Sequence, residues 1–169
     1  MTYTLEVWYY DGDRPKAEPV RTEPDLEAFL AYLLSHEQPH PAQIAGQGLP
    51  TVGRRNRPDR LFKLDVSPRG QVGALLYTGP IPAAVVDADS SQADAGPERQ
   101  SDIAKRGAWV TRTAEPIEDA PTLYIDKATQ TAFPQDAALP IALVRQALLE
   151  FQETGQRPTC VDWQQTHVV

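Results

Sequence analysis

Strand-like segments follow one another through the middle of this chain without a helix between them. Residues 61–66 alternate apolar and polar side chains, the turn residues Ser67-Pro68-Arg69-Gly70 follow, and the alternation resumes over residues 72–76. This pattern predicts a β-hairpin. Parallel neighbours would need a long crossover, usually a helix, so the sheet is expected to be antiparallel or mixed. Short apolar segments predict three further strands, at residues 109–110, 123–125 and 129–133.

The N-terminal part of the chain adds one strand and one amphipathic helix. Residues 3–10 alternate and include β-branched and aromatic side chains, which predicts a strand. Thr22 is the expected N-cap of the helix, and Pro39 is expected to stop it. The apolar stripe of this helix has the spacing i, i+3, i+4, i+7, i+8 and consists of Leu26, Phe29, Leu30, Leu33 and Leu34.

The last third of the chain predicts a second helix and a closing strand. Pro140 suits a first helical turn, Gly155 suits a left-handed residue after the last turn, and the apolar residues between them keep the helical period. Residues 159–164 then predict a strand. Together these elements predict an α+β fold, with an antiparallel or mixed central sheet and the two main helices packed on one face.

The remaining segments are expected to be loops inside a single domain that spans residues 1–169. Asp11-Gly12-Asp13 ends the first strand, and a loop leads from it to the first helix. Residues 39–60 are rich in Gly, Pro and Arg and are expected to form a loop with a short strand near Leu49–Val52. Residues 87–106 carry almost no apolar side chains, so burial cannot offset the entropy of ordering them, and we expect a mobile loop.

Composition excludes several classes of protein. Lys and Arg number 16 and Asp and Glu number 23, which gives a formal net charge of −7 and argues against a general nucleic-acid binder. No apolar run approaches the roughly 20 residues of a membrane-spanning helix, and the N-terminus lacks the pattern of a signal peptide. The single cysteine cannot form an internal disulfide. A cytoplasmic protein that binds neither a membrane nor nucleic acid is therefore expected.

Residues 36–40 spell H-E-x-x-H, the zinc signature of one class of metalloproteases. That chemistry needs His36 and His40 one turn apart on the same helical face, with Glu37 beside the metal-bound water. Pro39 lies inside that turn and would break the helix that sets the spacing. We therefore predict no catalytic residue, no metal site and no other cofactor. A small metal-dependent enzyme that uses His36, Glu37 and His40 is the alternative.

Two other chemical features are interpreted structurally. Cys160 has no histidine close to it in sequence that could act as a base, so we interpret it as a packed or half-exposed strand residue rather than a nucleophile. A basic segment could contact phosphates, but no aromatic residues alternate with its arginines to stack on bases. We interpret it as a solvated loop held by Asp59 and neighbouring acids. Its arginines are Arg54, Arg55, Arg57 and Arg60.

The first strand and the loop after it carry a surplus of acidic residues. This can be ordinary solubilising surface or an acidic face for a basic protein partner. For such a partner we predict an interface at Asp11, Asp13 and Glu18, with Trp8 or Tyr10 as an aromatic anchor. Alternation places both aromatic residues opposite the apolar side of the strand. The other possibility is a strand that is buried on both faces, with Trp8 in a second core layer.

A distinctive run closes the chain: Gly155-x-Arg157-Pro158-Thr159-Cys160-Val161-Asp162-Trp163-Gln164. It resembles the closing signature of the Imm1 family, the immunity proteins of bacterial polymorphic toxin systems. The strands at residues 64–66 and 72–77 and the helix from Pro140 to Phe151 are also similar to those of the family. The resemblance covers about residues 60–78 and 120–164, and the insertion at residues 87–106 has no counterpart in it.

The resemblance implies a non-enzymatic antitoxin. Toxins paired with this family often act on nucleic acid, as cytosine deaminases or nucleases, and form the C-terminal domains of secreted proteins. The implied mechanism is a 1:1 complex with that toxin domain, in which the immunity protein occludes the active site in the producer's own cytoplasm. A groove built for nucleic acid is basic, which fits the net charge of −7. The alternative is a non-catalytic adaptor domain that binds some other protein.

Overall fold

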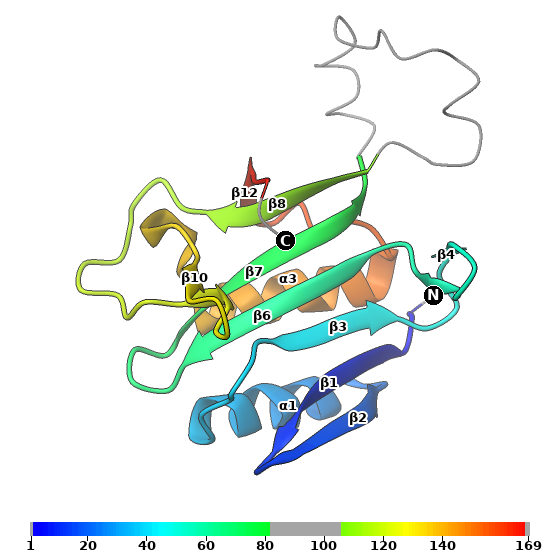
Figure 1. Cartoon of the computed structure of the whole chain (residues 1–169), viewed down its shortest axis with the longest axis horizontal. Coiled ribbons are helices and arrows are strands. Elements are labelled where there is room, and N and C mark those ends of the chain that lie inside the picture. The colour runs from blue at the N-terminus through cyan, green and yellow to red at the C-terminus, as the bar shows by residue number, and fades with distance from the viewer. Residues whose placement is uncertain (1, 82–105, 168–169) are drawn as a thin grey trace, which may run out of the picture.

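A computed structural model describes residues 2–81 and 106–167 of the chain. Most of its strands join one large antiparallel sheet, in the spatial order β12-β8-β7-β6-β3-β1-β2, and β11 pairs with β7 (Figure 1). The strands of this sheet are β1 (Leu5–Asp11), β2 (Arg14–Val20), β3 (Ala42–Gly46), β6 (Leu61–Ser67), β7 (Val72–Pro80), β8 (Arg106–Arg112), β11 (Leu139–Pro140) and β12 (Asp162–Gln165).

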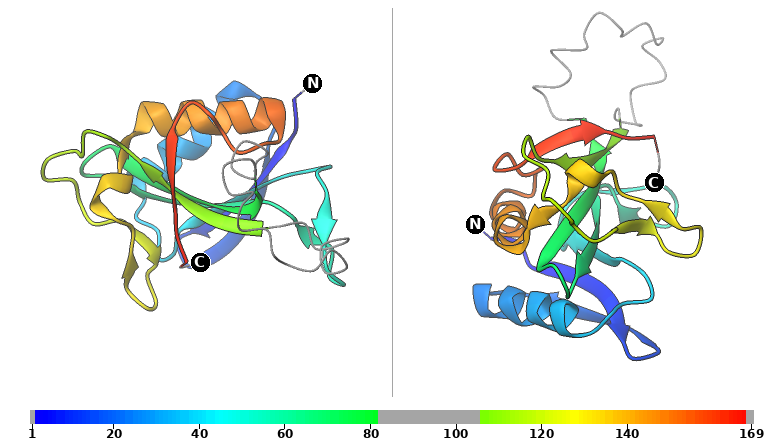
Figure 2. Two further views of the ribbon diagram at one scale, coloured as in Figure 1. Left: turned by 90° about the horizontal axis from the view of Figure 1, so that it is seen from above. Right: turned by 90° about the vertical axis from the view of Figure 1, so that its left-hand side faces the viewer.

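Two long helices lie on one face of this sheet, as Figure 2 shows in its left-hand view. They are α1 (Glu23–Ser35) and α3 (Ile141–Thr154). The predicted α+β class, with two main helices on one face, is therefore confirmed. The smaller elements are two short strand pairs and one helical turn: β4 (Thr51–Val52) with β5 (Arg57–Pro58), β9 (Tyr124–Asp126) with β10 (Thr131–Ala132), and η3 (Gln135–Ala137).

The ends of both helices follow from local chemistry. The predicted N-cap is confirmed, because Thr22 Oγ1 accepts from the backbone N–H of Asp25 at 3.3 Å and Asp25 accepts from the N–H of Thr22 at 3.1 Å. The helix ends at Ser35, whose hydroxyl donates to the carbonyl of Ala31, so the prediction that Pro39 stops it is wrong. Gly155 has φ 69° after α3, as predicted.

Two strands lie where loops are expected. β2 is an edge strand, and an edge strand tolerates proline because the missing N–H can face away from the sheet. Its prolines and its exposed side chains hide the strand pattern, because only Val20 is buried. β3 lies between β1 and β6 and buries Ala42 and Ile44. It is five residues long within a Gly- and Pro-rich stretch, so its alternation is too brief to stand out. The predicted short strand near Leu49–Val52 is present as β4.

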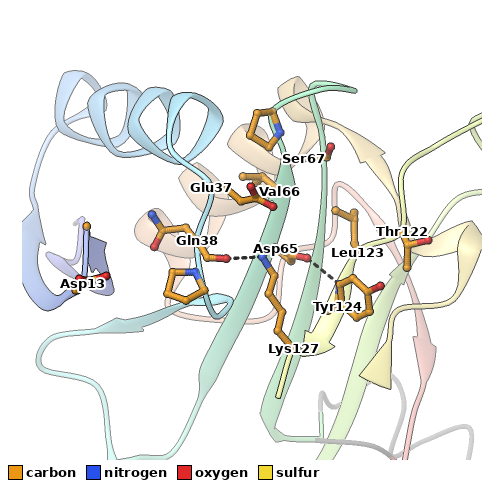
Figure 3. Close-up of a pocket in the computed structure, with 13 residues that line it drawn as sticks. Asp13, Glu37, Gln38, Asp65, Val66, Ser67, Thr122, Leu123, Tyr124 and Lys127 are labelled. Carbon is orange, nitrogen blue, oxygen red and sulfur yellow. Dashed lines mark hydrogen bonds and ion pairs between the residues drawn. The ribbon is translucent and has the colours of Figure 1, made fainter. Parts of the chain in front are cut away.

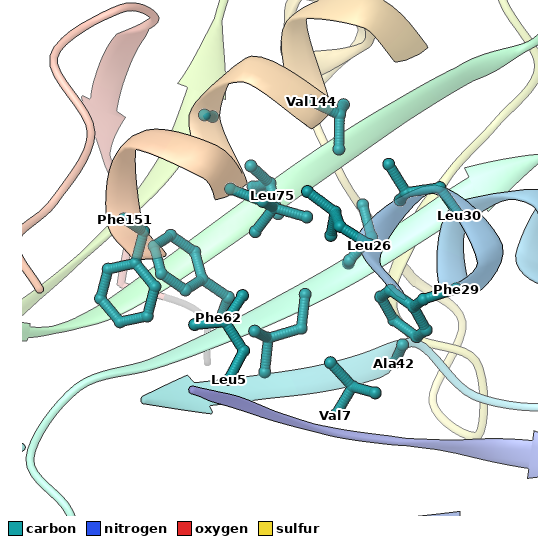
Figure 4. Close-up of a cluster of buried hydrophobic side chains, with 14 of the residues drawn as sticks. Leu5, Val7, Leu26, Phe29, Leu30, Ala42, Phe62, Leu75, Val144 and Phe151 are labelled. Carbon is teal, nitrogen blue, oxygen red and sulfur yellow. The ribbon is translucent and has the colours of Figure 1, made fainter. Parts of the chain in front are cut away.

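The two faces of the sheet hold separate cores. On the helix face, the apolar stripes of both helices pack on the alternate residues of the central strands (Figure 4). Phe62 at the centre of this core is fully buried, with its ring centroid 4.7 Å from that of Phe151. On the opposite face, a smaller core lies between β7, β8 and the segment 117–138, and contains Leu76, Val110 and Phe133. Of the loop expected at residues 87–106, only Arg106 is among the described residues, and it begins β8.

Candidate functional site

The face of the sheet opposite the helices is covered only in part. The small core on this face contains no residue of β1, β2 or β3. Strand register places Ala17, Trp8 and Gln43 side by side in one row on this face, and Pro15 beside Tyr10 in the next. Trp8 and Tyr10 are half-buried and the other three are exposed. We call this uncovered sheet surface of β1, β2 and β3 the open half.

A shallow apolar hollow adjoins Trp8 on the open half. It has a volume of about 300 Å³ and lies between the sheet and the segment that leads through β4 to β5. Its walls include Trp8, Ala45, Leu49 and Pro58. Trp8 is half-buried and belongs to neither buried core, so the alternative that places it in a second core layer is wrong. Its role as an aromatic anchor stays a prediction.

A larger cleft opens at one end of the sheet, beside the turn between β1 and β2 (Figure 3). Its volume is about 620 Å³. Four segments line it: the β1–β2 turn, the residues after α1, the end of β6, and residues 122–127. Asp13 and Glu37 are exposed at this cleft, and their carboxylates make no ion pair with the described residues. We call this hollow the acidic cleft.

The floor of the acidic cleft holds a buried carboxylate. Asp65 is 4% exposed, and its carboxylate accepts the N–H of Tyr124 at 2.7 Å. Lys127 lies 3.5 Å from the same carboxylate and donates to the carbonyl of Gln38 at 2.6 Å. Burial raises the pKa of Asp65 above its usual value, although these two partners act in the opposite direction. Through these contacts the carboxylate of Asp65 connects β6 to Tyr124 and Lys127 in the segment 122–127, so its first role is structural.

The structure separates the five predicted interface residues. Trp8 and Tyr10 lie on the open half, and Asp13 lies at the acidic cleft. Asp11, at the end of β1, accepts a hydrogen bond from the hydroxyl of Tyr32 at 2.9 Å. Glu18 pairs with Val7 in the strand register and therefore faces the helix side. It accepts from the hydroxyl of Tyr9 at 2.8 Å and forms an ion pair with Lys16 at 2.7 Å.

Sequence reasoning missed that residues 37–39 line this cleft. Helix α1 ends before them, so His36 and His40 do not share a helical face. The ring of His36 stacks on Tyr32 at 4.0 Å, and that of His40 lies 5.6 Å from Tyr10. Within residues 2–81 and 106–167, no three His, Cys, Asp or Glu side chains are grouped so that they could hold a metal ion. The H-E-x-x-H motif therefore supplies Glu37 to the wall of the cleft rather than a pair of zinc ligands.

The basic segment divides into two parts. Arg60 is buried, donates to Asp59 at 2.7 and 2.8 Å, and donates to the carbonyl of Gly155 at 2.7 Å. It therefore holds the end of α3 against the strand that begins at Leu61. The other arginines lie exposed around β4 and β5: Arg54, Arg55 and Arg57.

Cys160 is half-buried, but it lies before β12, which begins at Asp162, so the prediction that it is a strand residue is wrong. Burial and the neighbouring carboxylate of Glu150 raise the pKa of its thiol to about 11. A nucleophilic cysteine needs a lowered pKa, so this environment favours the structural interpretation.

A match to a known protein family shows which family the chain belongs to. The family model described as immunity protein Imm1 matches residues 14–165. The chain belongs to the Imm1 family. The match includes β2, β3, the closing run and most residues that line the acidic cleft, whereas β1 with Trp8 and Tyr10 and the turn residue Asp13 lie before its first residue.

Two further findings complete the comparison. No curated protein matches this Imm1 chain in sequence. No helix within the described part of the chain is long and apolar enough to cross a membrane.

Proposed function

We propose that this Imm1 protein neutralises a nucleic-acid-targeting toxin, such as a cytosine deaminase or a nuclease, by occluding its active site. In this proposal it acts without catalysing a reaction. It binds the C-terminal domain of the toxin as a 1:1 complex in the cytoplasm of the producer. One observation carries the proposal: in an immunity-family chain, the half-buried Trp8 and Tyr10 lie on the strand that leads into a cleft where Asp13 and Glu37 make no ion pair with the described residues.

The chemistry of this region suits a basic groove. A groove that holds nucleic acid presents Lys and Arg to phosphates. Exposed carboxylates can take the positions of those phosphates, and opposite charges on the two surfaces speed association and select the partner. Asp13 and Glu37 are available for this because the described residues do not neutralise them. Asp11 and Glu18 flank the same hairpin and are held in place by tyrosine hydroxyls.

The aromatic residues of the open half supply the apolar part of the proposed interface. Trp and Tyr are frequent among the residues that dominate binding energy, because they bury a large area at a low entropic cost. Trp8 already has a hollow of about 300 Å³ beside it that a side chain of the toxin can fill. On this basis the proposed interface combines Trp8 and Tyr10 with Asp11 and Asp13, and Glu37 is added from the cleft. Glu18 faces the helix side, so a toxin would reach it only by extending across the edge strand β2.

The function is tested by co-expression with the toxin domain encoded beside this protein. We expect growth of the host to be restored and a complex with one copy of each chain to elute from a sizing column. The purified complex should have no toxin activity. A toxin that stays fully active in the presence of excess immunity protein would contradict the proposal.

The surface is tested by calorimetry on that complex. Trp8→Ala should weaken binding by about 30-fold, which corresponds to about 2 kcal/mol. The double variant Asp13→Lys, Glu37→Lys should weaken binding more than Trp8→Ala does, because it places two positive charges against a basic groove. It should also make the affinity less dependent on salt concentration. Its matched control is Glu115→Lys, Asp162→Lys, which changes the net charge equally at a different hollow. Equal weakening by both double variants would show that net charge alone matters and would remove the acidic cleft from the interface.

A further inference from the structure

Three arginines gather near the buried hydroxyl of Tyr77, at the end of the sheet where β7 finishes and β8 begins. The charges of Arg60, Arg106 and Arg157 all lower the pKa of this hydroxyl, although burial has a larger and opposite effect. Packing is tight here, since a Cβ on Gly79 would lie 2.7 Å from the hydroxyl oxygen of Tyr77. The end of β7 and the start of β8 lie at the opposite end of the sheet from the turn between β1 and β2 (Figure 1), and that turn lines the acidic cleft.

The cluster carries more positive than negative charge. Among the described residues, Asp59 is the carboxylate whose charge acts on this hydroxyl, and Arg60 occupies it through two hydrogen bonds of 2.7 and 2.8 Å. Arg106 donates to the backbone carbonyl of Asp59 and has no carboxylate partner among the described residues. Arg157 has none there either, so no carboxylate within residues 2–81 and 106–167 balances these two guanidinium charges.

Arg157 is held in an unusual way. Its guanidinium carbon lies 4.9 Å from the ring centroid of Trp109 and 5.6 Å from that of Trp163. Trp163 is itself fixed, because its indole N–H donates to the carbonyl of Pro158 at 2.8 Å. The planar group therefore lies against indole rings, and its N–H groups make no hydrogen bond with the described residues. No buried side-chain nitrogen or oxygen of the described residues lacks a hydrogen-bond partner, so these N–H groups are open to solvent and can donate to an acceptor that a partner supplies.

We propose that Arg157 and Arg106 form a second binding site that accepts a carboxylate from an acidic side chain of the bound toxin. A stacked guanidinium presents a planar pair of N–H donors, which matches the two oxygens of a carboxylate. Arg and Trp are also the residue types most frequent at the centres of protein interfaces. The proposal rests on the proposed function, because it names a second contact with the same partner.

Geometry favours a protein carboxylate over a nucleic-acid phosphate at this site. Single-stranded nucleic acid binds where bases can stack on exposed aromatic rings. Trp109 is 5% exposed, and Arg157 covers a face of the half-buried Trp163, so neither ring offers an open platform. Opposite charges at two ends of one protein would fix the orientation of a toxin that contacts both, because complementary fields set the register of docking.

The site is tested with two variants in the toxin complex. Arg157→Lys keeps the charge but loses the planar fork, and should weaken binding by at least about tenfold. Arg106→Gln changes an exposed residue outside the tryptophan stack, so it should not affect folding, and it should weaken binding severalfold. This second variant therefore tests the site even if Arg157→Lys lowers the melting temperature. The matched control is Arg112→Gln at the other end of β8, which should bind normally.

The outcomes separate this inference from the proposed function. A complex that forms with wild-type affinity in both variants would overturn the carboxylate site while leaving toxin neutralisation intact. Absence of any complex with the wild-type protein would overturn both proposals. The wild-type protein is also tested against single- and double-stranded DNA. Salt-dependent DNA binding that Arg106→Gln abolishes would replace the carboxylate by a phosphate and would overturn the assignment.

Discussion

The two faces of the central sheet are built differently from the same strands. On the helix face, α1 and α3 cover the sheet and bury Phe62, Phe151 and Leu5 completely. On the opposite face, the segment 117–138 covers β7 and β8 but leaves the open half uncovered. Packing therefore constrains the residues of the covered face, whereas Trp8 and Tyr10 on the open half are only half-buried. The open half is where we propose that the toxin binds.

The largest expected effect on the free energy of unfolding comes from truncating a side chain at the centre of the helix-face core. Phe62→Ala should lower the free energy of unfolding by about 3–5 kcal/mol, because the ring leaves a cavity between Tyr77 and Phe151. Phe133→Ala on the opposite face should cost about 1–2 kcal/mol less, because its irregular surroundings can collapse into the space. Urea unfolding of both variants measures the difference. Equal costs would mean that the two cores are equally rigid.

A smaller effect on the free energy of unfolding should come from Asp65, whose carboxylate connects β6 to the segment 122–127. Burial raises the pKa of Asp65 in the folded protein, so its negative charge opposes folding above that pKa. The opposition disappears as the pH falls through the raised pKa toward the unfolded value. Wild type should therefore gain stability relative to Asp65→Asn on acidification from pH 7 to pH 4, in paired unfolding curves. A constant difference across this range would show that the charge of Asp65 is fully compensated.

The smallest effect should come from the ion pairs that join the two helices on the surface. Arg145 pairs with Glu23 and Glu27, but all three side chains are at least 35% exposed. Exposed pairs contribute little, so Arg145→Ala should cost about 0.2–1 kcal/mol and less in high salt. Toxin affinity should not change. A cost above about 2 kcal/mol would place this pair among the core contacts of the helix face, well beyond the range for exposed pairs.

Sequence reasoning succeeded where the signal was local and failed where it depended on partners far along the chain. The cap at Thr22, the turn before Gln71 and the left-handed Gly155 are each set by a few neighbouring residues, and all three are present. The edge strand β2 was missed because its outer side and most of its side chains face solvent, so it lacks the alternation that burial imposes. The acidic cleft was missed because its four segments meet only in the folded chain.

The predicted interface shows the same division. Alternation along β1 correctly set Trp8 and Tyr10 opposite Leu5 and Val7, because side chains alternate strictly in a strand. It could not show that Glu18 faces the helices while Asp13 faces the cleft, since that depends on the register of β2 against β1. Whether these residues bind the toxin stays a prediction.

The amino-acid sequence by itself determined the fold class, the two helices, the start of α1, the end of α3 and the resemblance to the Imm1 family. These depend on short-range periodicity and on capping chemistry, which act within a few residues. Only the tertiary structure decided which charges are free. It pairs Arg60 with a carbonyl 95 residues away and places Asp65 beside Tyr124, while Asp13 and Glu37 remain unpaired by the described residues. Electrostatic partners act through space, so the sequence order of charges does not reveal which of them a toxin can meet.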